Sequence, residues 1–345
     1  MNTVNKMQHG HDDLIHDVAY DFYGRRFVTC SSDQRLKVWD WNEEKKQWDL
    51  NDSWKAHDCS ILKVAWAHPE FGQVIASCSF DKSIRIWEEQ EREAKNSGRR
   101  WIEKARLVES SGSVQDIEFA PNYFGLKLAS IGADGMLRIY EATEVINLAS
   151  WTIMEEISVN PTGAESKGME ANYCLSWCPN RFMPEMIVVG CGRENTAKIF
   201  RCDQTSNKWH PYEILEGHND VVHDVAWAPS MGRSYQLIAT SSKDHRVRIF
   251  KLTEDGATGA YSQTTGAPVQ PSAINVNSSK KRFRIERVME SNEHEAEVWR
   301  VEWNITGTIL TSSGDDGKLR LWKCGYDGVW QCASIISAEQ RDGGR

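Results

Sequence analysis

Histidine, serine and aspartate side chains recur in this sequence at spacings that could build a catalytic triad. His11, Ser31 and Asp33 form one such set near the N-terminus, and a histidine between a hydroxyl and a carboxylate can activate a serine nucleophile. However, a histidine opens four units of the chain: His11, His57, His218 and His294. An enzyme needs one nucleophile rather than four copies of it. We therefore predict that these side chains form a repeated, buried hydrogen-bond network and that the chain is not an enzyme.

Cysteines supply the nearest approach to a metal site. Cys174 and Cys178 lie close together in the sequence, with Cys191 and Cys202 further on. Their spacing fits no zinc-binding motif, and small apolar residues on strands explain them better. The sequence also contains no P-loop, no dinucleotide-binding glycine motif, no HExxH and no nucleophile elbow. We predict no metal, no cofactor and no catalytic residue.

Composition excludes several classes of protein. The 345 residues include 41 basic and 49 acidic side chains, a net charge of −8, whereas a protein that binds nucleic acid through phosphates should be basic. The longest apolar run, 186–191, is far too short to span a membrane. The N-terminus lacks the apolar core of a signal peptide, and the nine cysteines form no CxxC pair. We expect a soluble protein of a reducing compartment, without direct nucleic-acid binding or membrane insertion.

A repeat shows which elements must hold the histidines and aspartates. An acidic residue is followed six positions later by an aromatic residue in six places: Asp33/Trp39, Asp81/Trp87, Asp134/Tyr140, Glu194/Phe200, Asp244/Phe250 and Asp316/Trp322. Polar and apolar residues alternate between the two members, which is typical of a strand with one buried face. Small residues just before the acid predict a tight turn from a preceding strand. Further strand-like strings lie upstream of each turn and downstream of each aromatic residue.

Four short strands in each of six units indicate an all-β fold, a six-bladed β-propeller. We predict a single domain over residues 1–345, with blades at about 11–57, 58–111, 112–170, 171–218, 219–294 and 295–337. The stretch 253–281 is rich in Gly, Thr, Ser, Gln and Pro. It is predicted to be a flexible loop inside blade 5.

The layout resembles WD40 repeats over nearly the whole chain. Gly-His stands at 10–11 and 217–218 and Trp-Asp at 39–40, so the fixed spacing carries the resemblance more than the literal dipeptides. The resemblance implies that the following residues form a structural network: His11, Asp33, Trp39, His57, Asp81, Trp87, Asp134, Tyr140, His218, Asp244, Phe250, His294, Asp316 and Trp322.

A ring of polar residues occupies the third position of the first strand in five blades. Its members are Asp17, Lys63, Asp116, Asp224 and Arg300, with Cys174 interrupting the ring in blade 4. We place these residues near one mouth of the propeller, where WD40 proteins often touch partners. Because the charges are of mixed sign, a solvated rim explains them equally well.

Closure of the ring is the next question, because a propeller that does not close leaves a sheet edge exposed. Many WD40 rings close when the N-terminus donates the outer strand of the last blade. Here blade 6 has its own fourth strand near 329–336, and only ten residues precede His11. Our hypothesis is a ring that is open between blades 1 and 6 and is completed by a partner's strands. The alternative is a ring that side-chain contacts alone close.

The hypothesis assigns apolar residues in or beside the first strands of blades 1 and 6, and one residue of the last strand of blade 6, to the partner interface. These residues are Leu14, Ile15, Val18, Tyr20, Val298, Trp299, Val301, Trp303 and Trp330.

Longer strings resemble the Sec-thirteen-homologue (Seh-one) family of WD40-repeat nucleoporins. The strings are 11–17, 20–26, 66–73, 76–81, 298–304 and 312–317, and they include residues that a generic WD40 repeat does not require. Blade 4 departs from the pattern, with Glu194 in place of Asp and no opening histidine.

Several properties follow from this resemblance as expectations. Members of the family are open six-bladed propellers, and a helical-solenoid nucleoporin inserts a β-blade that completes the ring. They are scaffold subunits, beside other subunits, of the Y-shaped outer-ring complex of the nuclear pore at the nuclear envelope, and they serve protein and mRNA transport. They also occur in a coat-like complex on the cytoplasmic face of the vacuole or lysosome membrane, which regulates the TORC-one pathway.

Other functions remain as alternatives. A substrate adaptor of a ubiquitin ligase should be a closed ring with a flanking recruiting domain, and the sequence shows no such domain. A propeller enzyme should have a unique polar cluster in its channel, whereas the clusters here recur between blades. The paralogous vesicle-coat propeller is the nearest rival, and the strings above oppose it.

Overall fold

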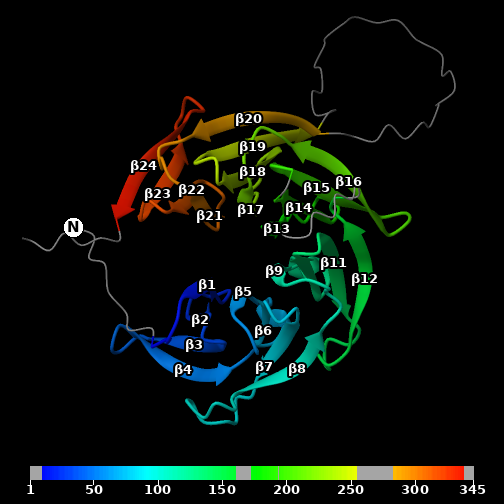
Figure 1. Cartoon of the computed structure of the whole chain (residues 1–345), viewed down its shortest axis with the longest axis vertical. Coiled ribbons are helices and arrows are strands. Elements are labelled where there is room, and N and C mark those ends of the chain that lie inside the picture. Colours follow the sequence, from blue (N-terminus) through cyan, green and yellow to red (C-terminus); the bar gives the residue numbers. More distant parts are fainter. Residues whose placement is uncertain (1–9, 161–171, 193, 255–282, 338–345) are drawn as a thin grey trace, which may run out of the picture.

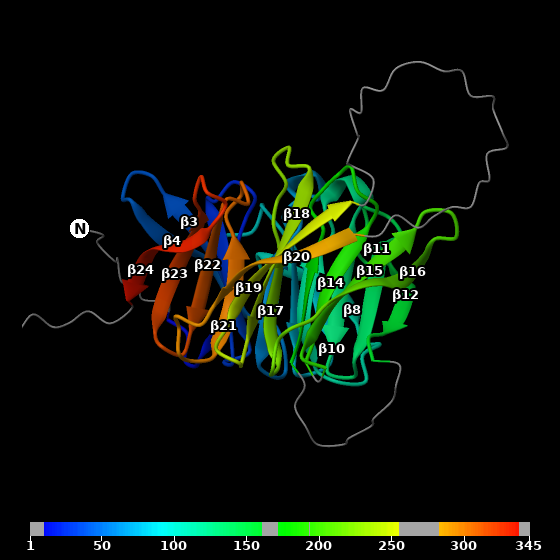
Figure 2. The ribbon, with the colours of Figure 1, turned by 90° about the horizontal axis from the view of Figure 1, so that it is seen from above.

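Six four-stranded antiparallel sheets surround a central channel in the computed structural model, which describes residues 10–160, 172–192, 194–254 and 283–337. In every sheet the strands are hydrogen-bonded in sequence order, so each sheet is one meander of the chain. Figure 1 shows the six sheets arranged as blades around the ring. Figure 2 shows that the strands run between the two faces of this ring. The fold is the predicted all-β, six-bladed propeller.

The strands have the following bounds. Blades 1 to 3 contain β1 (Ile15–Tyr20), β2 (Arg26–Ser31), β3 (Arg35–Asn42), β4 (Gln47–Lys55), β5 (Ile61–Trp66), β6 (Val74–Ser79), β7 (Ile84–Glu89), β8 (Trp101–Leu107), β9 (Val114–Phe119), β10 (Lys127–Gly132), β11 (Met136–Ala142) and β12 (Trp151–Ser158). Blades 4 to 6 contain β13 (Tyr173–Trp177), β14 (Met186–Cys191), β15 (Thr196–Asp203), β16 (Lys208–Leu215), β17 (Val222–Trp227), β18 (Tyr235–Ser242), β19 (Val247–Glu254), β20 (Phe283–Ser291), β21 (Val298–Trp303), β22 (Ile309–Gly314), β23 (Lys318–Cys324) and β24 (Trp330–Ser337). Two short 3-10 turns, η1 (Pro69–Phe71) and η2 (Asn122–Phe124), precede β6 and β10.

The turn between the second and third strands explains why the repeat carries an acid there. In blade 1 the Asp33 carboxylate accepts the amide of Arg35, two residues further on, at 2.9 Å. This local bond stabilises the turn. The residue directly after the acid adopts a left-handed backbone, with φ between 55° and 71°, in all six blades: Gln34, Lys82, Gly135, Asn195, His245 and Gly317. The repeated acid therefore fixes the turn that separates the two strands.

The innermost strands line the channel, and five of them contain an irregularity in register near their start. The residues at this point are His16, Leu62, Gln115, His223 and Trp299. A bulge of this kind re-aims the side chain that follows it. It brings the third residue of each strand, such as Asp17 or Lys63, toward the channel.

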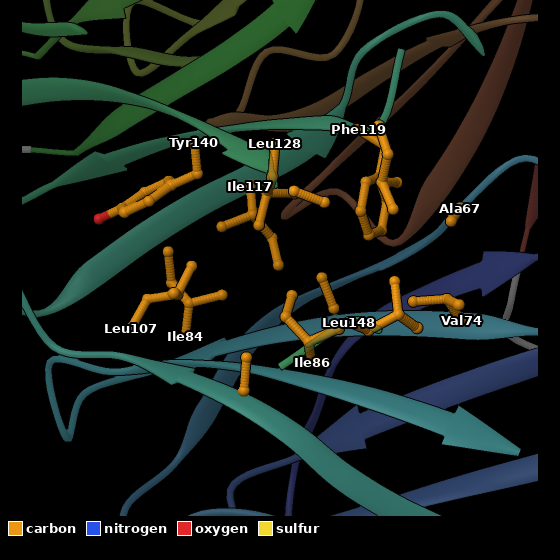
Figure 3. Packing of buried hydrophobic residues seen from close by; sticks show 14 of the residues in the cluster. Ala67, Val74, Ile84, Ile86, Leu107, Ile117, Phe119, Leu128, Tyr140 and Leu148 are labelled. Carbon is orange, nitrogen blue, oxygen red and sulfur yellow. The ribbon is translucent and has the colours of Figure 1, made fainter. Parts of the chain in front are cut away.

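Five clusters of buried apolar side chains join neighbouring blades. The cluster between blades 2 and 3 is drawn in Figure 3, where Ile84, Ile86 and Leu107 of blade 2 face Ile117 and Leu128 of blade 3. Four similar clusters join blades 1 to 2, 3 to 4, 4 to 5 and 5 to 6. Burial of this apolar surface is the main force that holds the blades in a ring.

The junction between blades 6 and 1 differs from the other five. Within the part of the chain that the structure describes, no buried apolar cluster bridges these two blades. Instead, Ile15, Val18 and Tyr20 of β1 are 39%, 48% and 56% exposed. In Figure 1 the ribbons β1–β4 and β21–β24 stand apart at the left of the ring.

Two details concern the predicted boundaries and the absence of membrane spans. The predicted loop 253–281 begins too early, because Thr253 and Glu254 pair with Arg284 and Phe283 in the β19–β20 ladder. The remainder, 255–281, lies outside the described residues.

No helix among the described residues is long and apolar enough to cross a membrane.

Candidate partner interface and central channel

A buried tetrad of side chains pins the turn in four of the blades. In blade 2, Nδ1 of His57 lies 2.9 Å from Oδ2 of Asp81, and Nε2 lies 2.8 Å from Oγ of Ser77. The indole N–H of Trp87 donates to the same hydroxyl at 3.0 Å. Both ring nitrogens are therefore occupied. The residues make a structural network of the predicted kind and leave no free nucleophile.

The same arrangement recurs with small changes. The sets in blades 1, 5 and 6 are His11–Asp33–Thr29–Trp39, His218–Asp244–Thr240 with Phe250, and His294–Asp316–Ser312–Trp322. Phe250 has no polar atom, so the blade 5 set lacks the indole bond.

The hydroxyl in blade 1 corrects one detail of the sequence analysis. Thr29, rather than Ser31, lies 2.8 Å from His11, and Ser31 accepts the amide of Asp33 at 3.1 Å. Sequence reasoning expected a hydroxyl in this network but identified none of the four that take part. A signal was available, because Thr29, Ser77, Thr240 and Ser312 all stand four residues before the aspartate.

Protonation of the tetrads follows their burial. Burial lowers the pKa of His57, His218 and His294 below the usual histidine range. Burial alone would raise the pKa of Asp81, but hydrogen bonds from His57 and Ser83 hold it far below its ordinary value. A neutral imidazole beside an ionised carboxylate is the resulting state.

Blades 3 and 4 lack the tetrad. Asp134 is paired with Arg138 at 2.9 Å instead of with a histidine, and Tyr140 donates its hydroxyl to Glu109 at 3.4 Å. In blade 4, Glu194 forms an ion pair with Lys198 at 2.6 Å. The predicted network residues of blade 3 therefore lie in place without forming the histidine-centred set.

The four cysteines considered as metal ligands belong to the apolar core. Cys174 and Cys178 lie in the cluster between blades 4 and 5, whereas Cys191 and Cys202 lie in the cluster between blades 3 and 4. Burial raises the pKa of each thiol. No three His, Cys, Asp or Glu side chains are grouped as a metal site anywhere in the described ranges.

The five polar residues that were predicted at the rim face one another in the channel. Nζ of Lys63 lies 3.6 Å from Asp116 and 4.0 Å from Asp17, and the Arg300 guanidinium lies 3.9 Å from both Asp17 and Asp224. Burial raises the pKa of Asp224 to about 6. Because the acidic and basic groups alternate and pair with each other, we assign the ring to channel structure rather than to a rim that contacts partners.

Hydrogen bonds also connect successive inner strands across the apolar clusters. Asp17, Asp116 and Asp224 accept the main-chain amides of Val64, Leu175 and Val301 in the following blades at 3.2, 2.9 and 2.9 Å. The indoles of Trp66, Trp177 and Trp303 donate to the carbonyls of Ala19, Glu118 and Ala226 in the preceding blades at 3.0, 3.1 and 3.1 Å. Blades 1, 3 and 5 thus present acceptors to the next blade around the ring.

Only part of the predicted partner interface faces the blade 6–blade 1 junction. On blade 1, Leu14, Ile15, Val18 and Tyr20 are exposed beside it. The equivalent of Val18 in blade 2 is Val64, which is 2% exposed and buried against blade 1. Blade 1 therefore presents an apolar face of the kind that every other blade buries.

The blade 6 half of that prediction is wrong. Val298, Val301 and Trp303 are buried in the cluster with blade 5, and Trp330 contacts Trp303 there. Trp299 stacks on His223 of blade 5 with ring centroids 4.1 Å apart. Equivalent strand faces point the same way around the ring. The face of β1 that is exposed at the junction therefore corresponds to the face of β21 that packs against blade 5. The opposite face of blade 6 carries Leu319, which is 41% exposed.

Comparison with known proteins agrees with this architecture. Residues 2–40, 48–88, 209–251 and 286–323 match the family described as “WD domain, G-beta repeat”. The chain is 44% identical to Nucleoporin SEH1 of Saccharomyces cerevisiae, over 96% of this chain and 98% of the yeast protein. It is 44% identical to nucleoporin seh1 of Schizosaccharomyces pombe, over 98% of each chain, and 41% identical to human Nucleoporin SEH1, over 94% of this chain and 86% of the human protein. The chain belongs to the SEH1 nucleoporin family.

Membership of the SEH1 family confirms the resemblance stated from the sequence and the prediction that the chain is not an enzyme. The repeat match is also informative about individual blades. Blades 3 and 4, which lack the histidine tetrad, lie mostly outside the matched stretches. The matched stretches therefore coincide with the four blades that have the histidine–aspartate pair.

One channel carboxylate gives this SEH1-family chain a testable pH dependence. Oε2 of Glu118 accepts the amide of Trp177 at 2.8 Å, and burial raises its pKa to about 8. This folded-state value lies above the unfolded value of ~4.3, so the folded state binds the extra proton between these limits. The stability that Glu118 contributes is complete below about pH 4.3 and is lost as the pH rises toward 8.

Replacement of Glu118 by glutamine should remove this dependence, because glutamine can still accept the Trp177 amide but does not titrate. We expect the free energy of unfolding of the variant, relative to that of wild type, to be about 1–3 kcal/mol higher at about pH 8 than at about pH 5. Urea unfolding at both pH values measures the difference. Glu286→Gln, an exposed change on β20, is the control. Parallel pH profiles for wild type and Glu118→Gln would show that Glu118 stays ionised in the fold.

Proposed function

We propose that this chain is a scaffold subunit of the Y-shaped coat complex of the nuclear pore, and that a helical-solenoid nucleoporin inserts a β-blade between blades 6 and 1. A role at the nuclear pore follows from membership of the SEH1 nucleoporin family. The mode of assembly and the neighbouring coat subunits are the proposal.

The observation that carries the proposal is the unmatched apolar face of blade 1. Ile61 and Val64 of blade 2 are 0% and 2% exposed because blade 1 covers them. Their equivalents in blade 1, Ile15 and Val18, are 39% and 48% exposed. Full burial of an aliphatic side chain contributes about 1.5–3 kcal/mol. A sheet that covers this face would therefore gain the free energy of apolar burial that the other five junctions already have.

Blade 6 supports the same location from the other side. Its junction face carries Leu319, whose equivalent in blade 1 is the fully buried Leu36. The ion pair between Arg300 and Asp17 spans the junction near the channel at 3.9 Å, and so long a pair, whose arginine is 40% exposed, contributes little to stability. Both faces are thus suited to an additional blade.

A second assembly is part of the proposal. By the family resemblance, the same chain also serves in a coat-like complex on the cytoplasmic face of the vacuole or lysosome membrane that regulates TORC-one signalling. The same junction would receive the blade there, because one surface can bind alternative blade donors.

Native purification of the tagged chain, followed by mass spectrometry in moderate salt, tests this function. We expect a stoichiometric helical-solenoid protein that is released only on unfolding, together with pore or vacuolar subunits that identify the complex. Recovery of a cullin-linked adaptor, of vesicle-coat subunits in place of nucleoporins, or of a stable monomer would overturn it.

A further inference from the structure

Glu302 occupies, in blade 6, the position from which Glu118 connects blade 3 to blade 4. Both residues stand next to last in their inner strands, β21 and β9. Both also pair with the residue five positions before the aspartate of the repeat, since Glu118 pairs with Ala129 and Glu302 with Thr311. The two side chains therefore have the same place in the fold.

Glu118 contacts the following blade in two ways. Its carboxylate accepts the amide of Trp177 at 2.8 Å, and its carbonyl accepts the indole N–H of the same residue at 3.1 Å. Trp177 is the last residue of β13. The glutamate thus binds both donors of a tryptophan that ends the next inner strand.

The carbonyl half of this contact recurs around the ring. Trp66 and Trp303, which also end their inner strands, donate their indoles to Ala19 and Ala226. Among the inner-strand ends of blades 2 to 6, Phe119 lacks a ring donor, and Trp227 directs its indole to Gln236 of its own blade. The contact therefore depends on a tryptophan that reaches the preceding blade.

Within the residues that the structure describes, no tryptophan of the next inner strand reaches Glu302. The last residue of β1 is Tyr20, which is 56% exposed and contacts Phe27 and Trp48 of its own blade. Glu302 is exposed to solvent in the isolated chain, and partial desolvation near the channel raises its pKa. The acceptor that connects blades 3 and 4 is thus present but unused at the blade 6–blade 1 junction.

Arg300 stands where three other inner strands have an aspartate, so Glu302 is the remaining side chain of β21 that can accept an amide from the next blade. At three other junctions the third residue of the inner strand is Asp17, Asp116 or Asp224, and its carboxylate accepts an amide of the next blade. A guanidinium has donors only. An incoming inner strand must therefore find its side-chain acceptor at Glu302.

We infer that Glu302 is the docking residue for the donated blade, and that the inner strand of this blade ends in a tryptophan whose amide and indole N–H groups bind the Glu302 carboxylate and carbonyl. The inference rests on the proposed function and specifies the chemistry of the partner segment. It selects a β-strand that ends in tryptophan over one that ends in phenylalanine or an aliphatic residue.

Affinity measurements with the copurified blade donor test the role of Glu302. Glu302→Ala should weaken binding about tenfold to a hundredfold, because the amide of the donated strand would be buried without its acceptor. Stability of the isolated chain should not fall, since no residue that the structure describes donates a hydrogen bond to the Glu302 carboxylate there. Glu286→Ala removes an equal charge from β20 and should bind like wild type.

The outcomes separate this inference from the proposed function. Equal affinity of Glu302→Ala and Glu286→Ala would overturn the docking role while leaving blade insertion intact. Absence of any blade donor bound to the wild-type chain would overturn both.

A photocrosslinking residue in place of Glu302 identifies the partner segment directly. We expect a cross-link to a strand that contains the predicted tryptophan, and substitution of that tryptophan by phenylalanine should weaken wild type but have little further effect on Glu302→Ala. A cross-link to a helix of the partner, to Tyr20 of the same chain, or to a strand without tryptophan would contradict the inference.

Discussion

Replacement of Val18 by aspartate should abolish binding of the blade-donating partner while leaving the isolated chain folded. Val18 is 48% exposed at the blade 6–blade 1 junction, and surface substitutions usually change stability by only about 0.5 kcal/mol. A donated blade would enclose the new carboxylate beside the carboxylate of Asp17, which directly precedes it in the chain. A buried charge without a partner costs several kcal/mol, so we expect affinity to fall by a factor of at least about 100.

Val64→Asp is the matched control, because Val64 has the same place in blade 2 and is 2% exposed. This variant buries a carboxylate in the cluster between blades 1 and 2 and should unfold the chain or destabilise it by several kcal/mol. Circular dichroism with urea titration measures stability, and partner affinity is measured for the folded variant. If Val18→Asp is destabilised as severely as Val64→Asp, blade 6 must cover blade 1 in the isolated chain, and the ring closes itself.

Repetition made the fold predictable from sequence. The spacing between acid and aromatic residue recurs in all six blades, and a short local turn enforces it: the Asp33 carboxylate accepts the Arg35 amide, and Gln34 takes a left-handed backbone. Such local interactions are encoded within a few residues. The number of blades, their order and the histidine–aspartate pairs could therefore be derived without a structure.

The directions of strand faces could not be derived in the same way. Period-two alternation shows that a strand has two faces but not which neighbouring blade each face meets. Val301 and Val18 occupy equivalent positions, yet Val301 is buried against blade 5 and Val18 lies at the junction. The difference depends on the order of blades around the ring, which is a property of the whole fold.

The channel ring and Glu302 show a related limit. Asp17, Lys63 and Arg300 alternate in charge in a way the sequence displays, but a bulge decides that they point inward to one another. The docking role inferred for Glu302 depends on comparison with the Glu118–Trp177 contact between two other blades. Contacts between blades join residues that are far apart in the chain, so no local pattern specifies them.

Removal of the Asp81 carboxylate should be the most destabilising change in the tetrads. Asp81 lies 2.9 Å from His57, and it accepts the amides of Asp58 and Ser83 at 3.2 and 3.0 Å. Asp81→Ala leaves the buried His57 and the Ser83 amide without their acceptor, and we expect the free energy of unfolding to fall by about 3–5 kcal/mol. Urea denaturation followed by tryptophan fluorescence measures the change, because Trp87 belongs to the same tetrad.

Glu194→Ala tests whether the tetrad or merely the acid of the repeat is responsible. Glu194 has the same place in blade 4 but pairs with Lys198, and its side chain is 35% exposed. Loss of such an ion pair should lower stability by about 1 kcal/mol or less. Equal losses for the two variants would mean that the turn carboxylate alone stabilises a blade. A large loss confined to Asp81→Ala would show that the histidine, hydroxyl and indole act with the carboxylate as one buried unit, which is why four copies of a triad-like set serve structure rather than catalysis.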